Sequence, residues 1–334
     1  MKKILVITTG GTIAMKKDRE TGGLIPAVSG KDLAAAVPGL AHYADVDVLE
    51  FSNKPSGWMT AADMFELSKL IDRLADTDQA DGFVITHGTD TMGYTAAALS
   101  YMIQKSPKPV VLTGSQKSIY NRDTDARNNL WRAVAYACHP DAWGVQIVFD
   151  NQVILGTRAR KTRTKSFNAF SSIDYPETAI FRDRRLIQFL QRPAEYTHAV
   201  FSTALDPNVF VLRLVPGMRA DIIPMLEGRY RALVLESFGV GGLPGGDDGA
   251  MFAAVRDWCG AGHLAVFTTQ VPHEGSDLAV YEVGRAAKAL PGVLEAHDMT
   301  PEATAVKLMW VMGQTTDRAE AEKLFLTPVQ WDIL

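Results

Sequence analysis

The fold is decided by residues 3–14, which read Lys3-Ile4-Leu5-Val6-Ile7-Thr8-Thr9-Gly10-Gly11-Thr12-Ile13-Ala14. Residues 4–8 are all apolar or β-branched, a pattern typical of a strand buried on both faces of a parallel sheet. The glycine pair lets the backbone turn sharply and approach another group closely. Thr12 then lies just beyond the carboxyl end of the strand, where open α/β sheets bind ligands. An ordinary strand-to-helix turn would look the same, so the rest of the chain has to decide.

Length and composition narrow the class of protein. The chain has 334 residues, of which 47% are hydrophobic and 22% charged, and its net charge is −4. This length favours two domains, and the absence of a long basic block argues against nucleic acid as a partner. No apolar run is long enough for a secretory signal or a membrane span, so we expect a soluble cytoplasmic protein. Cys138 and Cys259 lack metal-ligand spacing, and neither a metal nor another cofactor is expected.

Strand-like runs alternate with helix-period segments along the chain, as in a mainly parallel sheet flanked by helices. Buried strands are predicted at 82–86 and 109–113, and a hairpin over 144–155. The period is lost between Arg185 and Pro207 and then restarts. We therefore predict a two-domain α/β protein. It has a larger N-terminal parallel-sheet, flavodoxin-like domain at 1–190, a linker at 191–207 and a smaller C-terminal α/β domain at 208–334.

Three strand ends in the first domain have the same character. Each stops in glycine followed by a hydroxyl or carboxylate residue: Gly11-Thr12, Gly88-Thr89-Asp90 and Gly114-Ser115. Because the carboxyl ends of parallel strands meet at one edge of a sheet, these groups are expected to share one pocket. The polar segment 15–30 follows the first strand and reads either as a mobile lid over that pocket or as a surface loop.

Such a pocket would suit nucleophilic catalysis by a threonine. A threonine hydroxyl needs a neighbouring base, and Lys165 in the basic segment 157–172 is the candidate if it is neutral. Lys161 and the arginines nearby would supply part of the positive field that favours a neutral lysine. Asp90 would hold the lysine in a relay, and backbone N–H groups at the glycine turns would stabilise an oxyanion. On spacing alone, a solvated surface lysine remains the simpler interpretation of Lys165.

Taken together, these motifs resemble the bacterial asparaginase/glutaminase family, and most closely its cytoplasmic type I branch. The resemblance covers nearly the whole chain, in the family's order. It is carried by Thr9-Gly10-Gly11-Thr12-Ile13-Ala14, His87-Gly88-Thr89-Asp90-Thr91-Met92, Thr113-Gly114-Ser115-Gln116, Asp125 with Asn129-Leu130, Thr164-Lys165, Ala169-Phe170, Ser237-Phe238-Gly239-Val240-Gly241 and Asp298-Met299-Thr300-Pro301-Glu302-Ala303-Thr304.

The resemblance implies a catalytic role for four residues. Thr12 matches the nucleophile of the N-terminal loop, and Thr89, Asp90 and Lys165 match a triad. Which threonine attacks first stays open. The resemblance also implies a homotetramer, or at least a homodimer, whose active sites lie between subunits. Four residues are assigned to substrate binding: Ser56 for the α-carboxylate, Gly88, Ser115, and Glu282 across the interface, where a solvated helix carboxylate is the competing interpretation.

Two positions depart from the family pattern. Leu24 stands where most members have the tyrosine that orients the nucleophile, and Gly57-Trp58 replaces polar residues beside Ser56. A large ring there would change the volume and polarity of the pocket. The leading hypothesis is hydrolysis of L-asparagine to L-aspartate and ammonia through an acyl-threonine intermediate. The alternatives are a sibling amidase for another small amide, imide or lactam, and a non-catalytic protein that binds a small metabolite.

Overall fold

Strand β1 (Lys2–Gly10) is the centre of the larger sheet, and its residues from Ile4 onward are buried. It pairs in parallel with β4 (Ala44–Lys54) on one side and with β5 (Gly82–Thr86) on the other. The predicted two-face burial of this strand is therefore confirmed. The structure is a computed structural model, and it describes residues 1–17, 24–26, 36–37, 39–244 and 249–334.

The larger sheet has eight strands, and its parallel centre continues into an antiparallel margin. The order is β13-β12-β9-β8-β7-β5-β1-β4. Strands β4, β1, β5, β7 and β8 run parallel, whereas β8–β9, β9–β12 and β12–β13 pair antiparallel. The hairpin predicted over 144–155 is the β8–β9 pair. The further strands are β7 (Val110–Thr113), β8 (Val145–Phe149), β9 (Gln152–Leu155), β12 (Ala179–Arg182) and β13 (Arg185–Gln188).

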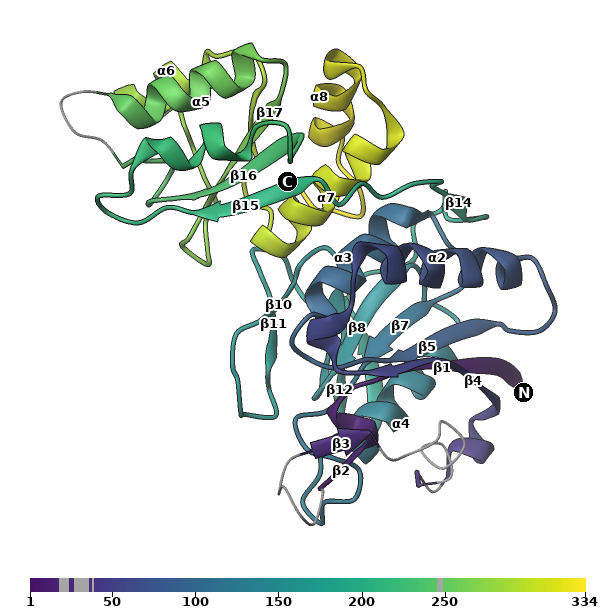
Figure 1. Ribbon diagram of the computed structural model, residues 1–334. Helices are drawn as coiled ribbons and strands as arrows, with labels where there is room; N and C mark the ends of the chain where they lie inside the picture. The colour runs from purple at the N-terminus through teal and green to yellow at the C-terminus, as the bar shows by residue number, and fades with distance from the viewer. Residues whose placement is uncertain (18–23, 27–35, 38, 245–248) are drawn as a thin grey trace. The chain divides into compact units, whose positions relative to one another are not determined.

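Helices cover both faces of this sheet, as the alternating sequence pattern predicts. Figure 1 shows α2 (Ala61–Ala75) and α3 (Met92–Met102) on one face and α4 (Ala126–Ala137) on the other. Leu130 and Val134 of α4 pack in one core with apolar side chains of β1, β5 and β7. Thr60 begins α2 through a capping box, in which its hydroxyl accepts from the Asp63 N–H.

The chain divides into two compact units, residues 1–202 and 203–334. The second unit contains a four-stranded, all-parallel sheet in the order β15-β16-β17-β18. The division falls inside the stretch 191–207 predicted as the linker, and the domain limits given above stay a prediction. The elements of this unit are β15 (Val209–Arg213), β16 (Ala232–Ser237), α5 (Ala250–Gly260), β17 (Leu264–Thr269), α6 (Glu282–Lys288), β18 (Val293–Glu295), α7 (Pro301–Gln314) and α8 (Arg318–Leu326).

Several short elements complete the fold. The basic segment 157–172 forms an antiparallel hairpin that the sequence pattern did not predict.

The predicted lid, residues 15–30, falls largely outside the described residues, which leave out 18–23 and 27–30. Its role as a lid therefore stays a prediction. No helix within the described part of the chain is long and apolar enough to cross a membrane. The short elements are η1 (Thr12–Ala14), β2 (Met15–Lys17), β3 (Leu24–Pro26), η2 (Leu40–His42), η3 (Ser56–Trp58), β6 (Ile103–Gln104), β10 (Ala159–Lys161), β11 (Phe170–Ser172), β14 (Val200–Phe201), η4 (Ala220–Ile222) and η5 (Pro224–Leu226).

A fully buried ion pair ties the end of the chain to α7 in the second unit. Lys307 Nζ lies 2.7 Å from an Asp332 carboxylate oxygen, and both side chains are 0% exposed. Lys307 Nζ also donates to the Thr327 carbonyl at 2.9 Å. Burial lowers the pKa of Lys307, and the neighbouring Asp332 opposes that shift. Removing one member of such a pair leaves a buried charge without its counter-ion, which is costly.

We therefore expect Lys307→Met to lower the free energy of unfolding of the second unit by about 3–5 kcal/mol. The double variant Lys307→Met/Asp332→Leu should recover most of that loss, because no charge is then buried. Lys323→Met is the matched control, because Lys323 is 74% exposed and its ion pair with Glu320 is long, at 3.7 Å. This substitution should change the free energy of unfolding by no more than about 0.5 kcal/mol. Urea unfolding followed by tryptophan fluorescence measures all three. Equal losses for Lys307→Met and Lys323→Met would contradict the expectation.

Candidate active site

Three backbone segments meet at the carboxyl edge of the larger sheet because two glycines lack side chains. Gly11 has φ +84°, and a Cβ there would run into the backbone of Gly88. A Cβ on Gly88 would in turn lie 2.6 Å from Ser56 Oγ. The loop after β1, the loop after β5 and the η3 turn are thus in direct contact. The loop after β7 joins them, because a Cβ on Gly114 would run into the His87 carbonyl. The predicted convergence of the three strand ends is therefore confirmed, and the η3 turn is an addition to it.

Thr12 begins the η1 turn directly after Gly11, and its side chain is partly exposed. The turn is closed by the Ala14 N–H, which donates to the Gly11 carbonyl at 3.1 Å. The loop between β7 and α4 supports this turn, because the Ile119 N–H donates to the Ile13 carbonyl at 3.2 Å. Ser118 Oγ also donates to the Met15 carbonyl. The Thr12 hydroxyl is therefore presented from a short, braced turn.

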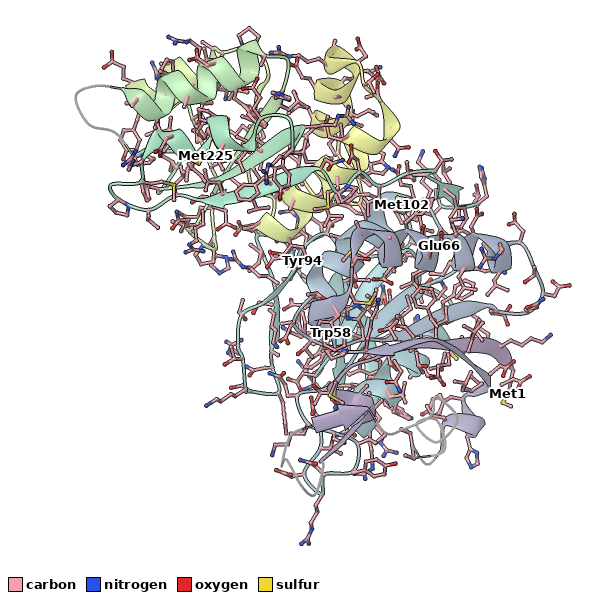
Figure 2. All side chains as sticks on the ribbon, viewed as in Figure 1. Met1, Trp58, Glu66, Tyr94, Met102 and Met225 are labelled. Atoms are coloured by element: carbon pink, nitrogen blue, oxygen red, sulfur yellow. The ribbon has the colours of Figure 1, made fainter. Side chains whose placement is uncertain are left out.

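Ser56 is fixed from the opposite side of the same edge. Its side chain is buried, and its carbonyl accepts a 2.8 Å hydrogen bond from Thr91 Oγ1 at the start of α3. Trp58, two residues on, is 69% exposed; Figure 2 labels its position. Since Ser56 is bonded to α3 and Thr60 caps α2, Trp58 is displayed from a turn that is anchored at both ends.

Thr89 and Asp90 are joined by a lysine, but it is Lys161 and not the predicted Lys165. Lys161 Nζ lies 2.7 Å from Thr89 Oγ1 and 2.6 Å from Asp90 Oδ1. Lys165 lies in the exposed turn between β10 and β11. The prediction placed the wrong lysine beside Thr89 because it did not include this hairpin. Strand β10 ends at Lys161, and the next four residues already belong to the exposed turn.

Gln116 joins the loop after β7 to the same hairpin. Its side-chain Nε2 donates to the Ser166 carbonyl at 3.1 Å, and Thr89 Oγ1 approaches its Oε1 at 3.4 Å, which is a weak hydrogen bond. Ser115, predicted to bind substrate, is buried, and its hydroxyl donates to the Lys117 carbonyl at 2.6 Å. That bond braces the loop, and a role of Ser115 in substrate binding stays a prediction.

His87 is a buried, neutral residue that sequence reasoning did not single out. Its Nδ1 lies 2.7 Å from the Gly88 carbonyl and its Nε2 2.9 Å from Thr95 Oγ1. Because a carbonyl oxygen can only accept, Nδ1 carries the proton and Nε2 accepts from the threonine. Burial lowers the pKa of His87 to about 4. The ring thus fixes the orientation of the Gly88 peptide without carrying charge at neutral pH.

Glu282 lies in the second unit, where it is the first residue of α6. There it lines a mainly apolar cavity of about 340 Å³, together with Phe252 and Val283. Its assignment to substrate binding stays a prediction, as does the consequence of Leu24, whose side chain lies outside what the structure describes. In the described part of the chain, no group of three His, Cys, Asp or Glu side chains is arranged to hold a metal ion.

Comparison with known proteins bears on the whole chain. The family model described as "Asparaginase, N-terminal" matches residues 3–195, and "Glutaminase/Asparaginase C-terminal domain" matches residues 208–325. An L-asparaginase of Thermococcus kodakarensis is 37% identical, over 96% of each chain. One of the glutamyl-tRNA(Gln) amidotransferase subunits of Pyrococcus furiosus is 35% identical, over 97% of this chain and 75% of its own. The solved structure of L-asparaginase I from Vibrio cholerae superposes with a TM-score of 0.87 at 28% identity, covering 100% of this chain and 99% of that one.

The buried imidazole predicts a pH dependence of stability. A free histidine has a pKa of 6.5, whereas burial lowers the pKa of His87 in the folded protein to about 4. As the pH falls, the unfolded chain therefore binds a proton at this residue before the folded protein does. Stability that is fully present above pH 6.5 is therefore lost toward pH 4, by up to about 3 kcal/mol. His87→Gln removes the titrating group, so the free energy of unfolding of this variant should fall less than that of the wild type between pH 6.5 and pH 4. His198 is exposed, and His198→Gln is the control: its free energy of unfolding, measured by urea titration at each pH, should fall with pH as steeply as that of the wild type. Identical slopes for all three proteins would disprove the role of His87.

Proposed function

The chain belongs to the asparaginase family of amidohydrolases, and from that premise we propose that it hydrolyses L-asparagine to L-aspartate and ammonia through an acyl-threonine intermediate. The name of the Thermococcus kodakarensis relative makes asparagine the first substrate to test. We assign the chemistry to the edge of the larger sheet at which Thr12, Thr89, Asp90 and Lys161 are found.

One observation carries this assignment: the contact of Lys161 Nζ with both Thr89 Oγ1 and Asp90 Oδ1, at 2.7 Å and 2.6 Å. In such a chain of hydrogen bonds the hydroxyl serves as nucleophile or acid, the amine serves as base, and the carboxylate orients the amine. Asp90 is 77% exposed, so its carboxylate remains open to a substrate ammonium group. This geometry supports Lys161 in the role that the sequence motifs predict for Lys165.

The proposed reaction has two halves. In its deprotonated form, which the reaction requires, the Lys161 amine takes the hydroxyl proton of the attacking threonine, Thr12 or Thr89, and the oxygen adds to the amide carbon. Backbone N–H groups of the glycine turns stabilise the oxyanion. The C–N bond breaks, and the nitrogen leaves as ammonia with the proton that the lysine returns. Water then adds to the acyl ester, gives up a proton to the same base, and releases the acid and the free hydroxyl.

A sibling amidase is the second candidate, and Trp58 favours it. Its ring is 69% exposed within two residues of Ser56, which we propose holds the substrate carboxylate. An exposed indole offers a flat apolar surface to a larger or less charged amide, imide or lactam. Location in the cytoplasm and assembly as a homotetramer or homodimer are further proposals that follow from the family. Sedimentation of the purified chain tests the assembly.

Substrate choice and covalent chemistry can be tested together. We expect ammonia release from millimolar asparagine, measured beside glutamine and a panel of small amides and lactams. Mass spectrometry of enzyme quenched with substrate should show an acyl adduct on Thr12 or Thr89. Turnover of another amide, with none of asparagine, would select the sibling amidase. No turnover and no adduct with any substrate would leave a non-catalytic binding protein and overturn the proposal.

The two lysines can be separated by a matched pair of variants. Lys161→Met should lower kcat at least about 100-fold, because it removes the base beside Thr89. Lys165→Met should keep kcat within about twofold, because its side chain lies in an exposed turn. Steady-state ammonia assays give both values, and circular dichroism confirms that each variant folds. A larger loss in Lys165→Met than in Lys161→Met would return the role to Lys165.

A further inference from the structure

The loop 114–119, between β7 and α4, is hydrogen-bonded to three parts of the candidate site. Its Ile119 N–H and Ser118 Oγ hold the turn that presents Thr12. Its Gln116 side chain holds the hairpin that contains Lys161 and approaches Thr89. A shift of this loop would therefore move the Thr12 turn and the Lys161 hairpin together.

The loop itself is held by one buried carboxylate. Asp125 Oδ2 accepts from the Gln116 N–H at 2.8 Å, and its Oδ1 accepts from the Lys117 N–H at 3.0 Å. Asp125 stands at the N-cap position of α4, yet its side chain makes no capping bond to that helix. The hydroxyl of Thr124 serves the start of the helix instead, since its Oγ1 accepts from the Ala126 N–H at 3.0 Å, and the Asp125 carboxylate faces the loop.

The anchor is supported by neighbours that fix its geometry. Asn129 Nδ2 donates both to Asp125 Oδ2 at 3.3 Å and to the Gly114 carbonyl at 2.9 Å. Thr124 Oγ1 donates to the Lys117 carbonyl at 3.0 Å. Burial raises the pKa of Asp125, while its bonds from the loop N–H groups oppose that shift. A buried carboxylate with two backbone donors is a strong, directional holder of a loop.

We propose that Asp125 is a positioning residue, which acts through the loop 114–119 to set the Thr12 turn and the Lys161 hairpin in register for the reaction. The inference rests on the proposed amidase function. It predicts a loss in kcat more than in KM, because the buried Asp125 carboxylate is bonded to the loop and small misplacements of reacting groups slow the chemical step.

The test compares Asp125→Asn with Gln116→Met and with the double variant. An asparagine keeps the shape but turns an N–H₂ group toward one of the two loop donors, so kcat should fall about 100-fold with KM within about threefold. Gln116→Met removes only the outer contacts and should lower kcat about tenfold. Both substitutions interrupt the same chain of contacts, so their effects should not multiply. The kcat of the double variant should lie within about twofold of the kcat of Asp125→Asn alone. Asp123→Asn is the control and should keep wild-type kinetics, because Asp123 is an exposed carboxylate that pairs with Lys117 at the surface.

Hydrogen exchange provides a readout that does not depend on activity. In Asp125→Asn the amides of Gln116 and Lys117 should exchange faster, and so should the Ile119 amide that holds the Thr12 turn. A wild-type protein that hydrolyses no amide would refute the proposed function, while the exchange data would still test the coupling. The positioning role is overturned if Ile119 exchange is unchanged while the other two accelerate. A double variant as slow as the product of the single effects, or an unchanged kcat in Gln116→Met, would overturn it too. If Asp125→Asn does not fold, Gln116→Met decides alone.

Discussion

The close contact of two backbones, at Gly11 and Gly88, is the constraint on which the rest of the site depends. Parallel pairing of β1 with β5 sets Thr8 beside Thr86, so the loops after both strands leave the sheet together. A side chain at Gly11 would hold these two loops apart, and a side chain at Gly88 would push away the η3 turn that carries Ser56. Only with the two backbones in contact can Thr12, Thr89 and Ser56 be presented from neighbouring turns. Parallel pairing brings the strand ends to the same edge of the sheet, and the missing Cβ atoms allow the loop backbones to come into contact there.

Two lysine–aspartate pairs of nearly equal length differ in burial, and therefore in what they contribute to stability. Lys307 and Asp332 are both fully buried, so each needs the other to offset the loss of hydration. Lys161 and Asp90 are 18% and 77% exposed, and an ion pair so open to water adds about 0–1 kcal/mol to stability. The second pair therefore contributes little to holding the fold together. Its geometry is better explained by what it does to Thr89, the third group within reach of the lysine nitrogen.

Local pattern was sufficient for the parallel core and insufficient for the hairpin. Residues 4–8 and 82–86 are continuous apolar runs, which only a doubly covered strand explains, and both are strands of the central sheet. The segment 157–172 has no such signal. It is basic and polar, and its pairing, Lys161 with Phe170, depends on contacts made after folding. Without that register, no rule of spacing could choose between Lys161 and Lys165. His87 was missed for a related reason, since its burial depends on Thr95 in the following helix.

The residues assigned to bond cleavage and those that would contact the rest of a substrate differ in how they are held. The groups to which we assign amide cleavage are held by hydrogen bonds to neighbouring loops, whereas Trp58, which we propose contacts the rest of a substrate, is exposed. Trp58 projects into solvent from a turn whose backbone is anchored at both ends. Its indole adds apolar surface within two residues of Ser56, which favours a larger or less charged amide over asparagine at that end of the site.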